Sequence, residues 1–341
     1  MTADVRPIVW NTDHLVLLDQ TQLPLVETYL EIRTIDALND AIQRLVVRGA
    51  PALGAVGGYG VALAMIQAER DGWSTEELAR QIDSVRNSRP TAVNLGWGVN
   101  RVEPFVSESL DRVLAEAHAI AAEDAAANHA MGRRGADWIE SHIERRPLRL
   151  LTHCNTGTLA TTEWGTALGV IRELHTRGLV ELVYADETRP LLQGARLTAW
   201  ELQRSGIPHV VQSDGAAAST ILRGLVDVAL IGADRIAANG DSANKIGSVG
   251  VALACKEAGI PFLVVAPVST VDLDTKTGDE IHIELRSGDE VTMLAGVRVA
   301  PLESQGFNPA FDVTPAHLIS AIVTEKTVVE VALGQTPQTQ L

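Results

Sequence analysis

The sequence predicts an α/β fold: a domain built on a parallel sheet at the C-terminus, preceded by a smaller, mixed but mainly helical domain at the N-terminus. After Pro147, five short apolar runs alternate with segments of helical spacing, which is the pattern of a parallel sheet with crossover helices. Before Pro147 the apolar residues recur mainly three and four apart, as on helices. The chain has 341 residues, which suggests two domains, and we place them at residues 1–125 and 126–341.

The N-terminal domain is predicted to begin with a small β element and to continue as helices. Apolar residues at 15–18 and 26–30 flank a turn-rich segment and predict two short strands. Thr34 is placed to cap the first helix. The predicted helices cover residues 34–47, 51–69, 75–88 and 103–144, the last as two helices or one bent helix that leads into the second domain.

The glycine-rich stretch at residues 48–60 lacks the GxGxxG spacing of a dinucleotide site, and a helix rather than a strand precedes it. Pro51 instead starts a helix whose small residues allow close packing. The loop before it, Arg48-Gly49-Ala50, offers backbone N–H groups and a guanidinium group, which suit an anion. The alternative is a tight helix–helix corner with a solvent-facing arginine. Arg89 is a second arginine, held just before a proline, although such an arginine usually only decorates the surface.

The C-terminal domain is predicted to collect polar residues at one edge of its sheet. The predicted strands are residues 148–152, 182–185, 209–212, 226–231 and 262–266. Right-handed crossovers bring the carboxyl ends of parallel strands to the same edge. The residues that follow these strands include His153, Cys154, Asn155, Asp186, Glu187, Arg189, Asp214 and Asp234. We expect the functional site there, because open α/β sheets place their ligands at this edge.

Residues 226–248 contain the clearest transition from strand to helix. Asp234 follows the apolar run, a polar loop covers residues 237–243, and Asn244-Lys245 open a helix that runs to residue 258. A helix N-terminus with a lysine beside it suits a phosphate group. The alternative is that Asp234 and Asn244 only turn and cap the chain, as Asp and Asn often do.

The remaining C-terminal residues predict β segments and a last helix. Residues 272–299 alternate as short β segments, with a hairpin turn at Gly288-Asp289. A helix is predicted to begin at Pro315, after Thr314.

Charge and cysteine content narrow the class of protein. The net charge of −15 and the pI of about 5.0 argue against nucleic acid or an anionic membrane as the main partner. The two cysteines, Cys154 and Cys255, show neither CxxC nor Cys/His ligand spacing, so no disulfide framework and no structural zinc site is predicted. We see no leader pattern and no run of about 18 apolar residues, so we predict no membrane segment and a cytoplasmic location.

Cys154 and Asp234 are the candidate reacting groups. Cys154 is expected between a strand and a helix, where the pKa of a thiol tends to fall, although a free cysteine is most often only a small buried residue. A thiol and a carboxyl group at one sheet edge, with arginine and lysine for a phosphate, indicate proton chemistry on a phosphorylated small molecule.

Six motifs of the chain resemble those of methylthioribose-1-phosphate isomerases. They are RGAPALG at residues 48–54, RPTAVNL at 89–95, HCNTG at 153–157, ETRPLLQGARLTAWEL at 187–202, SDGAA at 213–217 and GADRIAANGDSANKIGS at 232–248. They follow the order of that family over nearly the whole chain. The superfamily also contains regulatory subunits of translation initiation factor 2B and ribose-1,5-bisphosphate isomerases. The resemblance implies a small N-terminal domain and a Rossmann-like C-terminal domain, usually in a homodimer.

The resemblance implies an aldose–ketose isomerisation in methionine salvage, from 5-methylthioribose 1-phosphate to 5-methylthioribulose 1-phosphate, without a metal or another cofactor. By the family motif Asp234 donates a proton to the ring oxygen, and Cys154 stabilises the transition state or takes the C2 proton. If Asp234 is the donor, burial among apolar walls should raise its pKa. The positions that match substrate-binding residues are Arg48, Gly49, Ala50, Arg89, Gln193, Asn244 and Lys245.

Three other functions remain open at this stage. An isomerase of 5-deoxyribose 1-phosphate would use the same Cys154 and Asp234. A ribose-1,5-bisphosphate isomerase would need a second phosphate seat, for which the sequence shows no spare cationic cluster. A non-catalytic regulatory subunit on the same fold would bind a nucleotide or a sugar phosphate without turnover.

Overall fold

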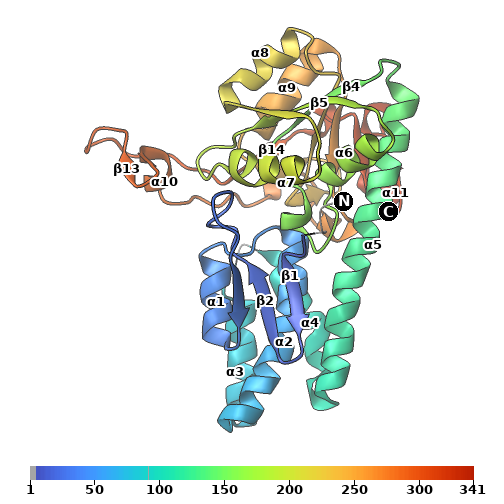
Figure 1. The fold of residues 1–341 in the computed structure, drawn as a ribbon. Coiled ribbons are helices and arrows are strands. Elements are labelled where there is room, and N and C mark those ends of the chain that lie inside the picture. The colour runs from blue at the N-terminus through green and yellow to red at the C-terminus, as the bar shows by residue number, and fades with distance from the viewer. Residues whose placement is uncertain (1–4, 91) are drawn as a thin grey trace. The chain divides into compact units, whose positions relative to one another are not determined.

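A computed structural model describes residues 5–90 and 92–341 of the chain, which separates into two compact units. Unit 1 comprises Met1–His129 and Thr156–Gly165, and unit 2 comprises Ala130–Asn155 and Thr166–Leu341. The mixture of strands and helices confirms the predicted α/β class (Figure 1). The domain boundary at residues 125 and 126 stays a prediction.

Unit 1 combines a small antiparallel sheet with a group of helices. The sheet has the order β1-β2-β3, with β1 at Ile8–Asn11, β2 at His14–Leu18 and β3 at Tyr29–Ile32. The helices are α1 at Ile35–Gln43, α2 at Ala50–Asp71, α3 at Thr75–Arg86, α4 at Val93–Val102, the 3-10 turn η1 at Glu103–Ser107, and the first part of α5 at Leu110–His142. Thr34 caps α1 as predicted, because its side chain accepts the N–H of Ala37. Helix α4 was not predicted from the sequence, and β3 begins later than residue 26.

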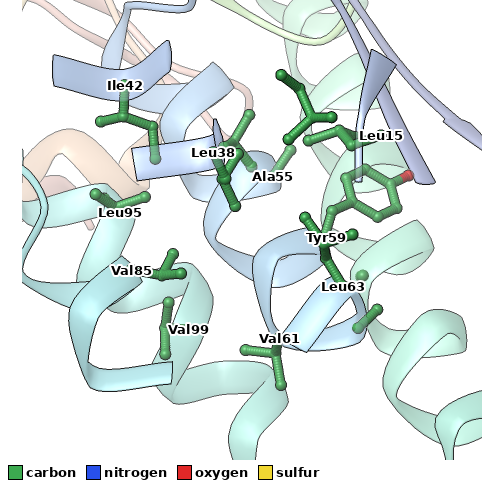
Figure 2. Packing of buried hydrophobic residues seen from close by; sticks show 14 of the residues in the cluster. Leu15, Leu38, Ile42, Ala55, Tyr59, Val61, Leu63, Val85, Leu95 and Val99 are labelled. Carbon is green, nitrogen blue, oxygen red and sulfur yellow. The ribbon is translucent and has the colours of Figure 1, made fainter. Parts of the chain in front are cut away.

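Helix α2 is the centre of the unit 1 core (Figure 2). Every residue from Ala52 to Ala64 is buried. Its glycines allow close packing as predicted, since a Cβ added at Gly57 would lie 2.4 Å from the backbone oxygen of Leu95 in α4. The helix also has the length and apolar composition of a membrane-crossing helix, which the sequence analysis did not expect, and 72% of its most apolar window is buried inside the protein.

Unit 2 is built on a sheet of seven strands in the order β16-β15-β10-β7-β4-β5-β6. All neighbouring pairs are parallel except β15 with β16. The strands are β4 at Leu148–Thr152, β5 at Val180–Asp186, β6 at His209–Gln212, β7 at Val228–Ile231, β10 at Phe262–Val265, β15 at Ala321–Val323 and β16 at Val328–Val329. The first five are the predicted strands. In doubly wound sheets the strand order reverses at a switch point, here between β4 and β7.

Helices cover both faces of this sheet, which explains why its strands are continuous apolar runs. One face packs against α5, α6 at Ala167–Thr176 and α7 at Ala199–Arg204, which follows the π-helix η3 at Gly194–Thr198. The other face packs against α8 at Ala217–Leu222 and α9 at Ser248–Ala258. Leu150 faces one side and Leu151 the other, as the alternation of a strand requires.

Two smaller sheets lie within residues 235–314, where the sequence predicted a polar loop, the start of a helix and a hairpin turn at another position. β8 at Arg235–Ala237 and β9 at Ser242–Lys245 form a hairpin within the sheet β11-β8-β9-β14, with β11 at Val271–Asp272 and β14 at Phe311–Thr314. A second hairpin joins β12 at Met293–Leu294 and β13 at Val297–Arg298. Short helices α10 at Asp289–Thr292 and α11 at Pro337–Gln340 complete the unit.

Two predictions for the C-terminal residues are therefore corrected. The hairpin turn lies at Ala295 and Gly296, with φ values of 49° and 79°, and not at Gly288-Asp289, which begin α10. The residues after Pro315 form a 3-10 turn and then β15, because the sheet of unit 2 extends past the five predicted strands. Propensity favoured a helix there, but pairing with β10 decides the structure.

Candidate active site

Cys154 and Asp234 follow two strands that are hydrogen-bonded neighbours. Thr152 at the end of β4 pairs with Leu230 near the end of β7. Cys154 lies two residues after β4, and Asp234 lies three residues after β7. The structure therefore brings both candidate residues to the switch point of the sheet, where ligands of such folds bind.

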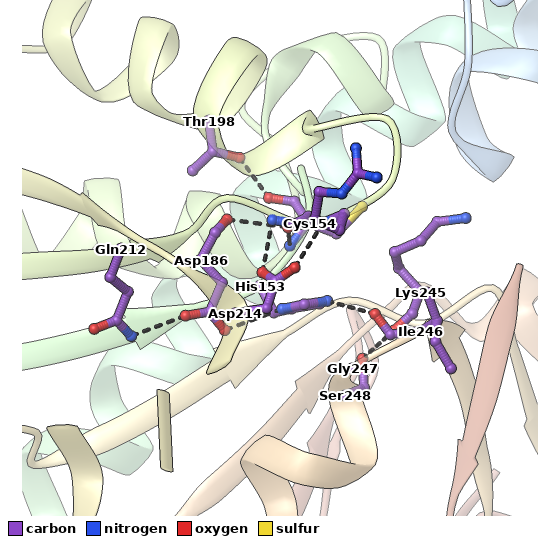
Figure 3. A network of polar contacts seen from close by, with 12 residues as sticks. His153, Cys154, Asp186, Thr198, Gln212, Asp214, Lys245, Ile246, Gly247 and Ser248 are labelled. Atoms are coloured by element: carbon purple, nitrogen blue, oxygen red, sulfur yellow. Dashed lines mark hydrogen bonds and ion pairs between the residues drawn. The ribbon is translucent and has the colours of Figure 1, made fainter. Parts of the chain in front are cut away.

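The backbone of Cys154 is held on both sides. Its N–H donates to Oγ1 of Thr188 at 2.8 Å, and its carbonyl oxygen accepts a hydrogen bond from Oγ1 of Thr198 at 2.6 Å (Figure 3). Its φ of 64° is in the left-handed region, which costs a non-glycine residue about 1 kcal/mol or more and is often found at functional sites. The residue is 7% exposed. The helix predicted to follow Cys154, after Gly157, begins only at Ala167, because Thr156–Gly165 fold with unit 1.

Asp234 opens the β8–β9 hairpin. Its N–H donates to the carbonyl oxygen of Ala243 at 2.8 Å. Its side chain is exposed, so the burial among apolar walls that we expected around this carboxyl group is not present. The residue lies at the open end of the hairpin, directly before β8, whereas the sequence predicted only a polar loop at residues 237–243.

Asn244 and Lys245 lie on strand β9 rather than at the start of a helix, because β9 pairs with β14. Nζ of Lys245 donates to the carbonyl oxygen of Ala310 at 2.9 Å and lies 4.6 Å from the centre of the Phe311 ring. Nδ2 of Asn244 donates to Oγ of Ser248, the first residue of α9, at 2.8 Å. This hydrogen bond connects strand β9 to the start of helix α9, one residue before Lys245.

The N-terminus of α9 holds a carboxylate of the chain itself. Oδ2 of Asp312 accepts the N–H groups of Gly247 at 2.8 Å and of Val249 at 3.2 Å. Burial raises the pKa of Asp312, although these hydrogen bonds partly offset it. The predicted phosphate seat at this helix end is therefore wrong, because an acidic side chain from the distant strand β14 occupies it.

Gln193 has helical backbone angles directly before η3 and is 6% exposed. The next residue, Gly194, comes so close to β5 that an added Cβ would lie 1.6 Å from the carbonyl oxygen of Asp186. Oε1 of Gln193 is buried and has no hydrogen-bond partner among the described residues. A buried acceptor without a donor is costly, so this oxygen is suited to a hydroxyl group of a bound ligand.

Arg48, Gly49 and Ala50 stand at the N-terminus of α2 in unit 1. Gly49 precedes the helix with a φ of 94°, and a Cβ there would lie 2.2 Å from the carbonyl oxygen of Ala160. Only glycine fits, and among the described residues the N-cap position of this helix makes no side-chain capping bond. The first N–H groups of α2 thus remain suited to an anion, with the half-buried Arg48 beside them.

Arg89 also belongs to unit 1 and is half-buried before α4. Its carbonyl oxygen accepts the N–H of Ala92 at 2.9 Å. Thr91, in the same motif, lies outside the described residues. The predicted site residues therefore form two sets, four in unit 1 and five in unit 2.

A buried polar network lies next to Cys154. The sequence placed its residues at this edge of the sheet but did not indicate what they do there. Nδ1 of His153 lies 3.0 Å from Oδ2 of Asp186, and Nε2 lies 2.8 Å from the carbonyl oxygen of Ile246. Oδ1 and Oδ2 of Asp214 accept the N–H groups of Thr188 and Arg189 at 2.7 and 2.6 Å. The position of these residues after predicted strands was the signal that the sequence offered.

His153, Asp186 and Asp214 also have the composition of a metal site, with ligand atoms within 4.8 Å of one another. Both ring nitrogens of His153 face oxygen acceptors, and both oxygens of Asp214 accept backbone N–H groups. These hydrogen bonds already use the atoms that would bind a cation. The geometry favours a hydrogen-bond network over a metal centre.

Comparison with known proteins places the chain in a family. The profile of the Initiation factor 2 subunit family matches residues 46–331. The chain belongs to this family. Two curated proteins are similar to this chain. One is a methylthioribose-1-phosphate isomerase of Gloeobacter violaceus. The other is a probable bifunctional methylthioribose-1-phosphate isomerase/methylthioribulose-1-phosphate dehydratase of Nocardia farcinica. The first is 48% identical and covers 95% of this chain and 92% of its own. The second is 50% identical over 98% of this chain, which spans only 61% of that protein.

Solved structures of two branches of the family are similar to this chain. The 5-methylthioribose 1-phosphate isomerase from Pyrococcus horikoshii superposes with a TM-score of 0.88 at 40% identity and covers 96% of this chain and 93% of that one. The translation initiation factor eIF-2B subunit delta from A. fulgidus gives a TM-score of 0.85 at 39% identity, with 97% of each chain covered. The resemblance to methylthioribose-1-phosphate isomerases is thus confirmed.

Proposed function

We propose that this chain is an isomerase that converts 5-methylthioribose 1-phosphate to 5-methylthioribulose 1-phosphate in methionine salvage. One observation carries the proposal: Cys154 and Asp234 follow the neighbouring strands β4 and β7 at the switch point of the sheet. The names of the relatives support it, since they are methylthioribose-1-phosphate isomerases over nearly the whole of this chain.

The reaction requires an acid and a group that handles hydrogen at C2. A proton placed on the ring oxygen lets the bond between C1 and that oxygen break. Hydrogen then moves from C2 to C1, and the C2 hydroxyl loses its proton, which leaves a ketone at C2 and a CH2 group at C1. We assign the first proton to Asp234, whose exposure lets substrate reach it directly. Cys154 stabilises the transition state or takes the C2 proton, and both routes give the same product.

The other predicted residues bind the substrate in this proposal. In unit 1, the N–H groups at the start of α2 suit a phosphate group, with Arg48 and Arg89 as cations. In unit 2, Lys245 offers a positive charge and Asn244 an amide group to the substrate. The buried Oε1 of Gln193 accepts a hydrogen bond from a sugar hydroxyl.

The test is turnover of the purified protein on three substrates, with the ketose product observed by NMR. The substrates are 5-methylthioribose 1-phosphate, 5-deoxyribose 1-phosphate and ribose 1,5-bisphosphate. We expect strong preference for the methylthio sugar. Comparable rates on the 5-deoxy sugar would keep the chemistry and widen the substrate class.

Matched variants separate the reacting groups from the fold. Asp234→Asn and Cys154→Ser should each lower kcat about 100-fold or more, because an acid or base in the transition state typically contributes that much. Asp274→Asn, an exposed carboxyl group, and Cys255→Ala, the other cysteine, are the controls. Near-full rates in either site variant would refute the assignment of roles.

A non-catalytic regulatory subunit is the second candidate, favoured by the similarity to the eIF-2B subunit delta structure. It predicts tight binding of a nucleotide or sugar phosphate and no turnover of any of the three substrates. The absence of turnover in the wild-type protein would put this function first.

The location, the oligomeric state and the domain arrangement are also part of the proposal. We place it in the cytoplasm as a homodimer, with unit 2 as a Rossmann-like C-terminal domain and unit 1 as a smaller, mainly helical N-terminal domain. The charge of −15 suits a small-molecule enzyme with no nucleic-acid or membrane partner. Light scattering of the purified protein tests the dimer, and a monomer would contradict it.

A further inference from the structure

His153 is buried between two oxygen atoms of different segments. The residue is 1% exposed, as is Asp186. Its Nε2 faces the carbonyl oxygen of Ile246, which can only accept, so Nε2 carries a proton. Its Nδ1 faces Oδ2 of Asp186, whose other oxygen accepts a hydrogen bond from Nε2 of Gln212 at 2.9 Å. Burial raises the pKa of Asp186, although the hydrogen bond and charge of His153 and the hydrogen bond from Gln212 partly offset it. When Asp186 is ionised, the contact between Nδ1 and Oδ2 requires a second proton on the ring.

The charges around His153 favour its protonated form. Asp186 on β5 contacts the ring, and Asp214 before α8 and Asp312 on β14 act on it through their charges. Burial alone lowers the pKa of His153, but the hydrogen bond and charge of Asp186, with the charge of Asp214, outweigh it, so the pKa of His153 is raised. Burial, with a smaller contribution from the charge of Asp186, raises the pKa of the Cys255 thiol on α9 to about 12, so it stays neutral.

The backbone after β9 is shaped to receive the ring. Gly247 has a φ of 109°, and a Cβ there would lie 2.7 Å from Cε1 and 2.9 Å from Nε2 of His153. No other residue type fits this position without moving the ring. The contact between His153 and the turn at residues 246–247 is therefore close and specific.

The ring connects the segment that carries Cys154 with the segment that carries Asn244 and Lys245 (Figure 3). His153 precedes Cys154 at the end of β4, and Ile246 follows Lys245 at the end of β9. Thr188 makes a second connection between Cys154 and Asp186. Its Oγ1 accepts the N–H of Cys154 and donates to the carbonyl oxygen of Asp186 at 3.0 Å.

We propose that His153 is a positioning residue that stays protonated: it donates to Asp186 and to Ile246, and thereby fixes Cys154 relative to Asn244 and Lys245. The kinetic part of this inference rests on the proposed isomerase function, whereas the protonation state does not. Small displacements of reacting groups reduce the rate of the chemical step. The helix N-terminus in unit 1 that we assign to the phosphate is not part of this network.

The first experiment measures the ring directly. The protein is labelled with 15N-histidine, and the resonances of His153 are identified by their loss in His153→Gln. In the wild-type protein we expect both ring nitrogens to show the shift and the attached proton of an imidazolium at pH values above 6.5, the ordinary pKa of histidine. A neutral ring in this range, with the shared proton on Asp186, would overturn the protonated state, and this measurement needs no substrate.

The second experiment measures positioning. Asp186→Asn removes the carboxylate and should give a neutral ring with its proton on Nε2. We expect kcat to fall by up to about 100-fold, because a small misplacement of a reacting group slows the chemical step by this much, with KM changed much less. His282→Gln, an exposed histidine, is the control. If folded Asp186→Asn and His153→Gln both keep wild-type kcat, the positioning role is refuted. If the wild-type protein itself lacks turnover, the proposed function fails while the NMR result still decides the state of the ring.

Discussion

The carboxylate of Asp312 offers a prediction that can be worked through from the structure. It is contributed by β14 and caps α9, whose start adjoins the site. Asp312→Ala would remove the acceptor of two backbone N–H groups, those of Gly247 and Val249. Helix α9 would then begin without a capping side chain next to His153.

The expected cost of Asp312→Ala is about 2 kcal/mol. Loss of a capping side chain typically costs about 1 kcal/mol, and a hydrogen bond to a charged group is worth about 1.5 to 3 kcal/mol. The bond to Gly247 at 2.8 Å is the stronger one, and that to Val249 at 3.2 Å is weaker. The stabilisation by these two hydrogen bonds is partly offset in the wild-type protein, because Oδ1 of Asp312 is buried without a partner among the described residues.

Asp312→Asn separates the cap from the charge. The amide oxygen can accept the same two N–H groups, so we expect an unfolding free energy within about 1 kcal/mol of wild type at neutral pH. Burial raises the pKa of Asp312 in the folded protein above its ordinary value of 3.8. The stabilisation from this carboxyl group is therefore fully present below the ordinary value and is lost as the pH rises through the raised one. The stability of wild type relative to Asp312→Asn should fall over this interval.

Urea unfolding followed by circular dichroism measures both variants across pH. For a unit of this size the Asp312→Ala cost corresponds to a fall in Tm of about 4 to 8 °C. The reasoning is wrong if Asp312→Ala is as stable as Asp312→Asn at neutral pH. It is also wrong if the wild-type protein gains stability over Asp312→Asn as the pH rises.

Three further predictions concern other positions. Burial opposes ionisation of Asp227, but the hydrogen bonds and charge of Arg149 outweigh it and lower the pKa. Asp227→Asn should thus cost about 2 to 3 kcal/mol in urea unfolding at neutral pH, and the difference should vanish as the pH falls through the lowered pKa; a pH-independent cost would contradict this. Gly49→Ala should cost about 3 kcal/mol or more, since its Cβ would lie 2.2 Å from a backbone oxygen, whereas the control Gly72→Ala, with a φ of 69° and nothing within 4 Å, should cost about 1 kcal/mol. Equal thermal shifts in the two glycine variants would refute the steric argument. Burial raises the pKa of Cys255 to about 12, so mass spectrometry should find its thiol unmodified by iodoacetamide in the folded protein and modified in urea; rapid modification without urea would contradict the burial.

The sequence by itself determined the framework of unit 2 and the position of its reacting groups. Parallel strands that are covered on both faces need long apolar runs, so β4 and β7 stand out without any tertiary information. Residues that directly follow such strands must meet at one edge of the sheet. For this reason Cys154, Asp186 and Asp234 could be placed together from local pattern alone, and the motifs sufficed to suggest the family.

Tertiary structure decided the features that depend on pairing between distant segments. Asn244 and Lys245 look like a helix start in isolation, but β14, more than 60 residues later, pairs with them and makes them a strand. The same strand brings Asp312 to the N-terminus of α9 and fills the expected phosphate seat. The exposure of Asp234 and the enclosure of His153 likewise depend on how loops fold over the sheet edge. Local sequence cannot specify these contacts, because the free energy that selects them comes from residues far apart in the chain.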